Sequence, residues 1–108
     1  MARVKIVTFV PSEQADAVRV AMADAGAGMQ GDYGSMSFSS TGIGRFKPLE
    51  GAHPFIGKVG ELEKVTEEKI EVICDRLVAK TVIVAMKQTH PYEEVAYDIY
   101  PLIEEEEL

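Results

Sequence analysis

The sequence has few of the features that mark several large classes of protein. Its one cysteine, Cys74, cannot form a disulfide within the chain, as is typical of proteins in a reducing compartment. Only 11 Lys and Arg stand against 18 Asp and Glu, and the net charge of -7 argues against binding to nucleic acid or anionic membranes. No apolar run approaches the roughly 20 residues of a transmembrane helix, and no signal-peptide core opens the chain. We therefore expect a cytoplasmic protein.

A catalytic set of residues is also missing. The hydroxyl side chains around residue 40 have no positioned base near them in the sequence, so nucleophilic catalysis has no support. Glu93 and Glu94 are neighbours, and on an extended segment they point to opposite faces, so they do not form an acid-base pair. Cys74 is either a reactive thiol near a helix N-terminus or a buried inert one, and the second case is the commoner. We expect a protein that is not an enzyme.

The 108 residues, of which 46% are hydrophobic and 27% charged, have the size and composition of one globular domain spanning 1–108. Alternating apolar residues predict a strand over 3–10. Apolar residues at helical spacing after Ser12, the expected N-cap, predict a helix to about residue 25. The segment 26–31 has the glycine spacing of a dinucleotide fingerprint, but it follows a helix, so we interpret it as a helix stop and loop.

The middle of the chain is rich in glycine. Alternation predicts a strand over 33–40, a turn at Thr41 and a hairpin partner over 42–47. A long loop rich in Gly and Pro is expected over about 42–60, and loops of this length are often functional. The residues 61–74 are predicted to be extended, and the last five, 104–108, to form an acidic tail that frays.

The two halves of the chain repeat at an offset of 64 residues, the separation of Lys5 from Lys69. The same offset pairs identical residues through the first helix and as far as Tyr33 with Tyr97. The β-branched run 81–84 alone would also allow a strand, but the repeat predicts a second helix from Asp75, its N-cap, to about residue 89. Two such β-α-β units predict an α+β, ferredoxin-like domain, an antiparallel four-stranded sheet with two helices on one face.

The other sheet face carries Val7, Phe9 and Ile73 in this prediction. An uncovered apolar sheet face is typical of an oligomer interface, so we expect a dimer or trimer. The alternative is scattered surface hydrophobes beneath a loop.

The densest group of polar, aromatic and conformationally restricted residues lies over 89–102. His90 has two interpretations: it caps the second helix, or it joins Glu93 and, from the long loop, His53 as ligands of a divalent metal ion. Other residues near these turns are candidates for ligand or interface contacts: Tyr92, Glu94, Phe55 and Tyr97. A structural role for both histidines stays open.

Several motifs resemble one protein family. The sequence is similar to a stand-alone version of the domain inserted in YqfO-type proteins of the Nif-three family, and the resemblance covers nearly the whole chain. It rests on the following segments: Val10-Pro11, Ala25–Gly28, the glycines and prolines of 42–60, His90–Glu94, Ala96–Asp98 and Tyr100–Leu102. The shorter motif His90–Glu93 is similar to the closing motif of the divalent-cation-tolerance protein CutA.

The resemblance implies a PII/CutA-like fold, which agrees with the internal repeat. It also implies that the paired metal ions of the long Nif-three proteins are held by flanking domains, so a cyclohydrolase activity is not expected here. CutA and PII relatives assemble as trimers and bind small ligands or ions at subunit boundaries. This leads to the hypothesis of an oligomeric binding or regulatory module, and the alternative is a protein-protein interaction adaptor with structural histidines and no ligand.

Overall fold

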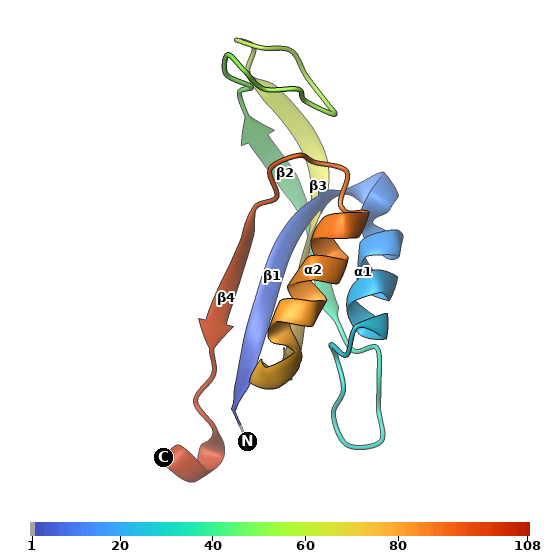
Figure 1. Ribbon diagram of the computed structural model, residues 1–108, viewed down its shortest axis with the longest axis vertical. Coiled ribbons are helices and arrows are strands. Elements are labelled where there is room, and N and C mark those ends of the chain that lie inside the picture. Colours follow the sequence, from blue (N-terminus) through green and yellow to red (C-terminus); the bar gives the residue numbers. More distant parts are fainter. Residues whose placement is uncertain (1) are drawn as a thin grey trace.

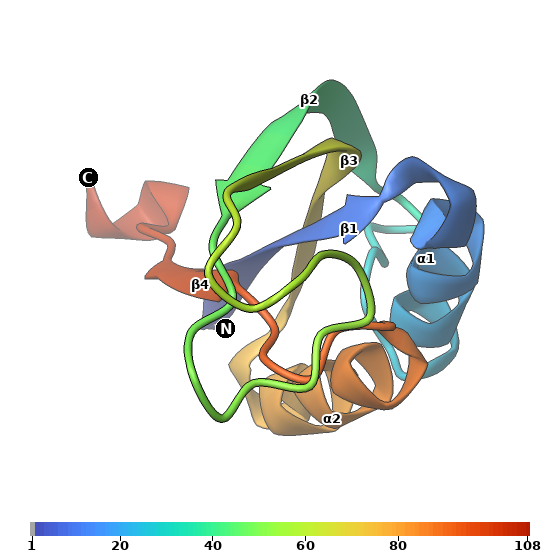
Figure 2. The same ribbon diagram turned by 90° about the horizontal axis from the view of Figure 1, so that it is seen from above.

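Residues 2–108, which the computed structural model describes, form a four-stranded antiparallel sheet with two helices on one face (Figures 1 and 2). The elements follow in the order β1 (Arg3–Pro11), α1 (Ala15–Asp24), β2 (Phe38–Phe46), β3 (Glu63–Asp75), α2 (Ala79–Thr89) and β4 (Tyr97–Pro101). Short 3-10 helices cover Ser12–Gln14, Arg76–Val78 and Glu105–Glu107. The strand order is β2-β3-β1-β4, so the central pair consists of the two strands that begin the repeated units. The predicted ferredoxin-like fold is confirmed.

The internal repeat corresponds to a repeat of structure. Shifting β1 by 64 residues places it on the last nine residues of β3, and the 3-10 turn and helix after each strand coincide in the same way. Asp75, the predicted N-cap of the second helix, caps the 3-10 turn that precedes α2 rather than α2 itself, since its carboxylate accepts the Leu77 N–H at 2.8 Å. The repeat therefore identified the second helix correctly despite its β-branched residues.

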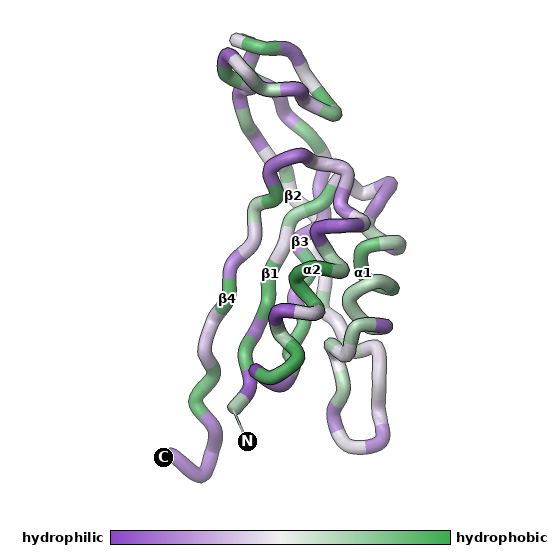
Figure 3. Tube along the Cα trace, in the orientation of Figure 1, coloured by the Kyte–Doolittle hydropathy of each residue, from purple (hydrophilic) through white to green (hydrophobic). Residues whose placement is uncertain are grey.

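The core lies between the sheet and the two helices. Alternate residues of β1 and β3 are buried against it, and α1 and α2 each contribute one stripe of buried residues. The hydropathy along the chain shows apolar stretches on β1 and a hydrophilic C-terminal end (Figure 3). The main core side chains are Val4, Ile6, Val10, Val18, Met22, Ile70, Val72, Val82 and Met86. Cys74 also belongs to this core, and burial raises the pKa of its thiol, as expected for an inert cysteine.

Four local predictions need correction. Ser12 caps no helix with its side chain, because α1 begins after an intervening 3-10 turn. The expected strand over 33–40 is mostly loop, held by the Met36 N–H donating to the Gly28 carbonyl at 2.9 Å, and the repeat therefore ends before Tyr33. No turn occurs at Thr41, since β2 runs through it as one strand paired with β3. The long loop therefore begins after residue 46 rather than at 42.

The open sheet face is only partly apolar. Val7 is fully buried within it, Phe9 and Ile73 are half-buried, and Lys5 and Glu71 form an ion pair of 3.4 Å on the same face. The C-terminal tail is more ordered than predicted, since Glu104 makes a two-pronged ion pair with Arg3 at 2.9 and 3.0 Å. Within residues 2–108, no helix is long and apolar enough to cross a membrane.

Candidate functional site

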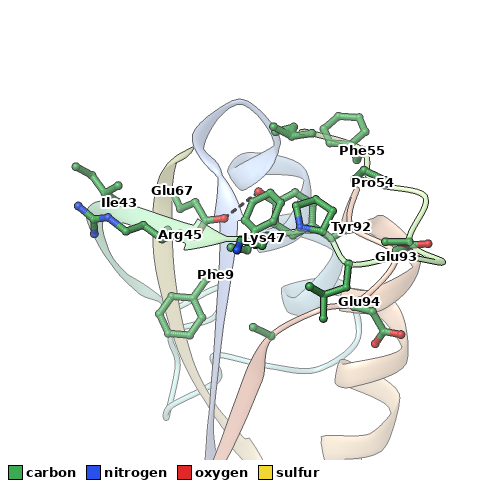
Figure 4. Close-up of a pocket in the computed structure, with 17 residues that line it drawn as sticks. Phe9, Ile43, Arg45, Lys47, Pro54, Phe55, Glu67, Tyr92, Glu93 and Glu94 are labelled. Atoms are coloured by element: carbon green, nitrogen blue, oxygen red, sulfur yellow. Dashed lines mark hydrogen bonds between the residues drawn. The ribbon is translucent and has the colours of Figure 1, made fainter. Parts of the chain in front are cut away.

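A cavity of about 550 Å³ lies between the ends of β2 and β3, the loop that joins them, and the turn that follows α2. The loop between β2 and β3 lies over the end of the sheet in the view of Figure 2, and the His53 backbone N–H of this loop contacts Glu93 of the turn after α2. Most of the lining is apolar or aromatic, and a single buried carboxylate, that of Glu67, lies among these groups. Figure 4 shows Glu67 hydrogen-bonded to Tyr92, with Pro54 and Phe55 contributed by the loop. This combination of apolar walls and one placed polar group is typical of small-molecule sites.

The turn after α2 is held by His90. The helix ends here because His90 has an extended conformation (φ -67°, ψ 137°) and Pro91 follows it. The His90 side chain is only 6% exposed, and its Nε2 lies 2.7 Å from the Phe9 carbonyl oxygen of β1. Its Nδ1 accepts the Tyr92 N–H at 3.1 Å. Since one ring nitrogen accepts, the other carries the proton and donates to Phe9, so the ring is neutral and both of its nitrogens are occupied.

Burial lowers the pKa of His90 from its ordinary value of 6.5, against smaller opposing effects of the Phe9 hydrogen bond and the Glu67 charge. A histidine in the unfolded chain takes up a proton as the pH falls below about 6.5, whereas the folded one stays neutral until a lower pH. The contribution of His90 to stability is therefore complete above this pH and is lost as the pH falls towards the lowered folded pKa.

We predict that the free energy of unfolding of the wild type falls between pH 7.5 and pH 5 faster than that of His90→Ala. The difference in slope should reach at most about 1.4 kcal/mol per pH unit, the value for one proton. Urea denaturation of both proteins between pH 7.5 and pH 5 measures this difference in slope. A difference between the two proteins that does not change with pH would contradict the neutral buried state of His90.

Glu67 is the buried acid of the cavity. It is 8% exposed, and its Oε2 accepts the Tyr92 hydroxyl at 3.0 Å. Burial, followed by the hydrogen bond and charge of Glu67, raises the pKa of Tyr92 well above its ordinary value, so the phenol is a permanent donor. The carboxylate lies against Gly44, where a Cβ atom would be 1.9 Å from Oε1. A glycine at this position of β2 therefore makes room for the acid.

Aromatic rings surround this pair. The ring of Tyr92 packs edge-on against Phe46 at a centroid distance of 5.7 Å, and Phe55 lies 6.4 Å away on the loop side. His90 is 5.0 Å from Tyr92 on the buried side. The turn, β2 and the loop are thus held together by one ring, that of Tyr92.

The residues expected to bind a metal ion, His90, Glu93 and His53, are not arranged as a set of metal ligands. Glu93 does meet the loop, but its Oε1 accepts the backbone N–H of His53 at 2.8 Å, so this contact connects the loop to the turn. Neither ring nitrogen of His90 is free. Among residues 2–108, no three His, Cys, Asp or Glu side chains are arranged to hold a metal ion. Metal binding by His90, Glu93 and His53 stays a prediction.

The other candidate residues divide into two groups. Tyr92, Glu94 and Phe55 line the cavity together with Glu93. Tyr97 does not, because it lies in β4, where the Lys87 ammonium sits 4.8 Å above its ring. Sequence reasoning missed Glu67 as well as Gly44 and Phe46. Alternation within each strand could have placed Gly44 and Phe46 on one face of β2 and Glu67 on one face of β3. That Glu67 meets Gly44 depends on the register between the two strands, which a single sequence does not reveal.

Comparisons with known proteins agree with this architecture. The chain matches no established family profile. It is 56% identical over 98 residues to the GTP cyclohydrolase 1 type 2 homolog of Bacillus subtilis, covering 91% of this chain and 26% of that protein. The Mycobacterium tuberculosis protein of the same name is 46% identical over 99 residues, covering 92% and 26%.

Two solved structures show the relation in three dimensions. A Bacillus cereus protein related to NIF3 superimposes with a TM-score of 0.83 and 48% identity, over 95% of this chain and 26% of that one. The periplasmic divalent cation tolerance protein CutA of Archaeoglobus fulgidus gives a TM-score of 0.67 at 15% identity, over 94% and 85%. The second likeness concerns the fold alone.

The fold defines the chain as a CutA-like, ferredoxin-type domain. More particularly, it is a homologue of one segment of the Nif-three proteins, as the identities of 56% and 48% over nearly the whole chain indicate. It spans about a quarter of the length of the relatives it matches.

Proposed function

We propose that this chain is a binding or regulatory module that takes a small ligand in the cavity beside Tyr92, and that it is not an enzyme. The observation that carries the proposal is the buried Glu67 carboxylate, which faces a cavity of about 550 Å³ lined by apolar groups. Burying a carboxylate beside one neutral hydrogen-bond donor lowers the free energy of unfolding, so the stability of the fold does not explain why Glu67 is buried. A ligand that contacts it supplies that reason.

The arrangement also supports a regulatory role. Three segments of the cavity wall, β2, the loop after it and the turn after α2, meet through Tyr92 and the contact of Glu93 with the backbone of His53. A ligand lodged among them would stabilise their closed arrangement, and a partner protein able to contact that arrangement would then sense the ligand. No nucleophile with a positioned base lines this cavity within the described residues, so the activity in the relatives' name is not proposed here.

We further propose that the protein acts as a homo-oligomer, a dimer or trimer, in the cytoplasm. The edge strand β2 and the exposed Phe38 beside the open sheet face favour self-association, since edge strands and exposed aromatics are typical of interfaces. The same features fit the second candidate function, an adaptor that binds a protein partner without a ligand. Size-exclusion chromatography with light scattering decides the oligomeric state.

A ligand screen with a blocked-cavity variant tests the proposed function. We expect at least one member of a panel of amines, carboxylates, nucleotides and divalent metal salts to raise the melting temperature. A ligand at 100 times its Kd stabilises by about 2.7 kcal/mol, which corresponds to a shift of several degrees for a domain of this size. Ala52→Trp, which fills the cavity, should abolish the shift, whereas Lys80→Trp on exposed α2 should leave it unchanged.

The outcomes separate the candidate functions. If no compound shifts the melting temperature, the small-ligand proposal is wrong and the adaptor is favoured. If a divalent cation alone does so, and His90→Ala and Glu93→Ala abolish the shift while Ala52→Trp does not, the metal prediction holds and the cavity is not the site.

A further inference from the structure

The charges around the cavity favour a cationic ligand. Its lining contains three carboxylates, those of Glu67, Glu93 and Glu94, against the two cations Arg45 and Lys47. Arg45 precedes Phe46 in β2, so its side chain leaves the strand on the other face, and Figure 4 shows its guanidinium directed away from Glu67. Glu67 forms no ion pair with any Lys or Arg of residues 2–108. Lys47 also lines the cavity, but among the described residues no cation lies within ion-pair distance of the Glu67 carboxylate.

Within the described residues, one oxygen of this carboxylate accepts no hydrogen bond, and it lies against Gly44. The Tyr92 hydroxyl occupies Oε2, whereas within the described part of the chain no hydrogen bond engages Oε1. The phenol stays protonated because its pKa is raised, so it does not compete as a second anion. An ammonium or guanidinium group of a ligand would complete the pair with a charge-assisted hydrogen bond.

The aromatic rings indicate the same chemistry. The chain has four Phe and four Tyr, and four of these eight rings line this one cavity: Phe9, Phe46, Phe55 and Tyr92. Rings attract cations through the negative charge of their faces and also pack against apolar groups. A carboxylate among several rings is thus a site for an organic cation rather than for a bare metal ion, which needs several oxygen or nitrogen ligands.

We propose that the ligand of the cavity is a small organic cation, an amine or guanidine with an apolar body, whose charged group pairs with Glu67 and whose body lies against Phe46 and Phe55. This inference rests on the proposed function and adds the chemical class of the ligand. Glu67 and Tyr92 set the charge specificity, and the rings on β2 and the loop set the size of the apolar part.

Three probes that share a phenyl body and differ in charge test the inference: phenethylamine, 2-phenylethanol and 3-phenylpropionate. We expect the amine to bind wild-type protein at least tenfold more tightly than the alcohol, and the acid to bind most weakly, as measured by calorimetry at pH 7. Glu67→Gln keeps the size of the side chain and an acceptor for Tyr92, and it should weaken amine binding tenfold to a hundredfold, the usual range for a charge-assisted hydrogen bond. It should leave alcohol binding unchanged.

Glu61→Gln is the matched control, since this exposed carboxylate lies in the loop between β2 and β3 but does not line the cavity. We expect it to change amine binding less than threefold, because exposed charges are screened by solvent. The comparison of the three probes on wild-type protein needs no variant, so it decides the question even if Glu67→Gln is unstable.

Two results would overturn the cation assignment. Equal or tighter binding of the alcohol or the acid, blocked by Ala52→Trp, would show that the cavity binds ligands of another class and would leave the proposed function intact. Failure of every amine to bind, with a carboxylate or a nucleotide of the panel binding in the cavity, would do the same. Failure of every probe and every panel member would overturn both proposals.

Discussion

His90→Ala should lower the free energy of unfolding by about 3 kcal/mol. The substitution leaves the Phe9 carbonyl and the Tyr92 N–H without their partner, and an unsatisfied buried group costs about 1–3 kcal/mol. Loss of the ring also opens a space beside Tyr92. Because the turn then loses its attachment to β1, we also expect weaker binding of any cavity ligand.

The second histidine of the chain is the matched control. His53 also precedes a proline and an aromatic residue, but it is exposed, and its backbone N–H rather than its ring donates to Glu93. His53→Ala should therefore change the free energy of unfolding by less than about 0.5 kcal/mol. Urea denaturation of the wild type, His90→Ala and His53→Ala measures the two changes in the free energy of unfolding. Similar small losses for both variants would show that His90 is not a structural anchor, and the metal hypothesis would gain weight.

Gly44→Ala should destabilise the protein by about 1–3 kcal/mol, the usual range for an added group in a packed site. Its Cβ would lie 1.9 Å from Oε1 and 2.4 Å from Cδ of Glu67, so the carboxylate must leave its position beneath Tyr92. The hydrogen bond between Glu67 and Tyr92 would then be lost together with the charge that faces the cavity. We therefore expect amine binding to fall at least tenfold.

Gly42 offers a control on the same strand and the same sheet face. A Cβ at this position meets no atom within 4 Å, so Gly42→Ala should be neutral or should stabilise by about 0.5–1 kcal/mol as a glycine leaves a strand interior. Thermal unfolding and calorimetric titration of the two variants separate the collision with Glu67 from the general effect of alanine in β2. Equal stability of both variants would mean that Glu67 rotates away without loss and that its buried position is not required.

These predictions concern a segment that recurs in longer proteins. The Bacillus cereus protein related to NIF3 carries the same architecture in about a quarter of its chain. A cavity that senses a small cation would give such proteins a regulatory domain separate from the rest of the molecule. Measuring the binding of the three probes to a long relative would test whether its corresponding segment also binds a small cation.

The sequence by itself determined both helices, the strands β1 and β3 and the ferredoxin-like architecture. The identities between the two halves, such as Ile6 with Ile70 and Met22 with Met86, fall on core positions, so the repeat indicated two similar units and the ferredoxin-like sheet. Local patterns were less reliable where glycines dominate. The glycine-rich pattern predicts a turn at Thr41 with 42–47 returning as a hairpin partner, yet residues 38–46 form one strand, because β3 pairs with all of them.

The site was decided by the tertiary structure. The sequence indicated the turn at His90 and left open whether His90 is structural or a metal ligand, because a residue type alone does not show which hydrogen bonds its side chain makes. Glu67 lies 25 positions from Tyr92 along the chain, and only the pairing of β3 with β1 and β2 brings it beneath that ring. Local periodicity determines which segments become helix or strand, whereas the contacts of a cavity depend on strand register and loop path, which are properties of the whole folded chain.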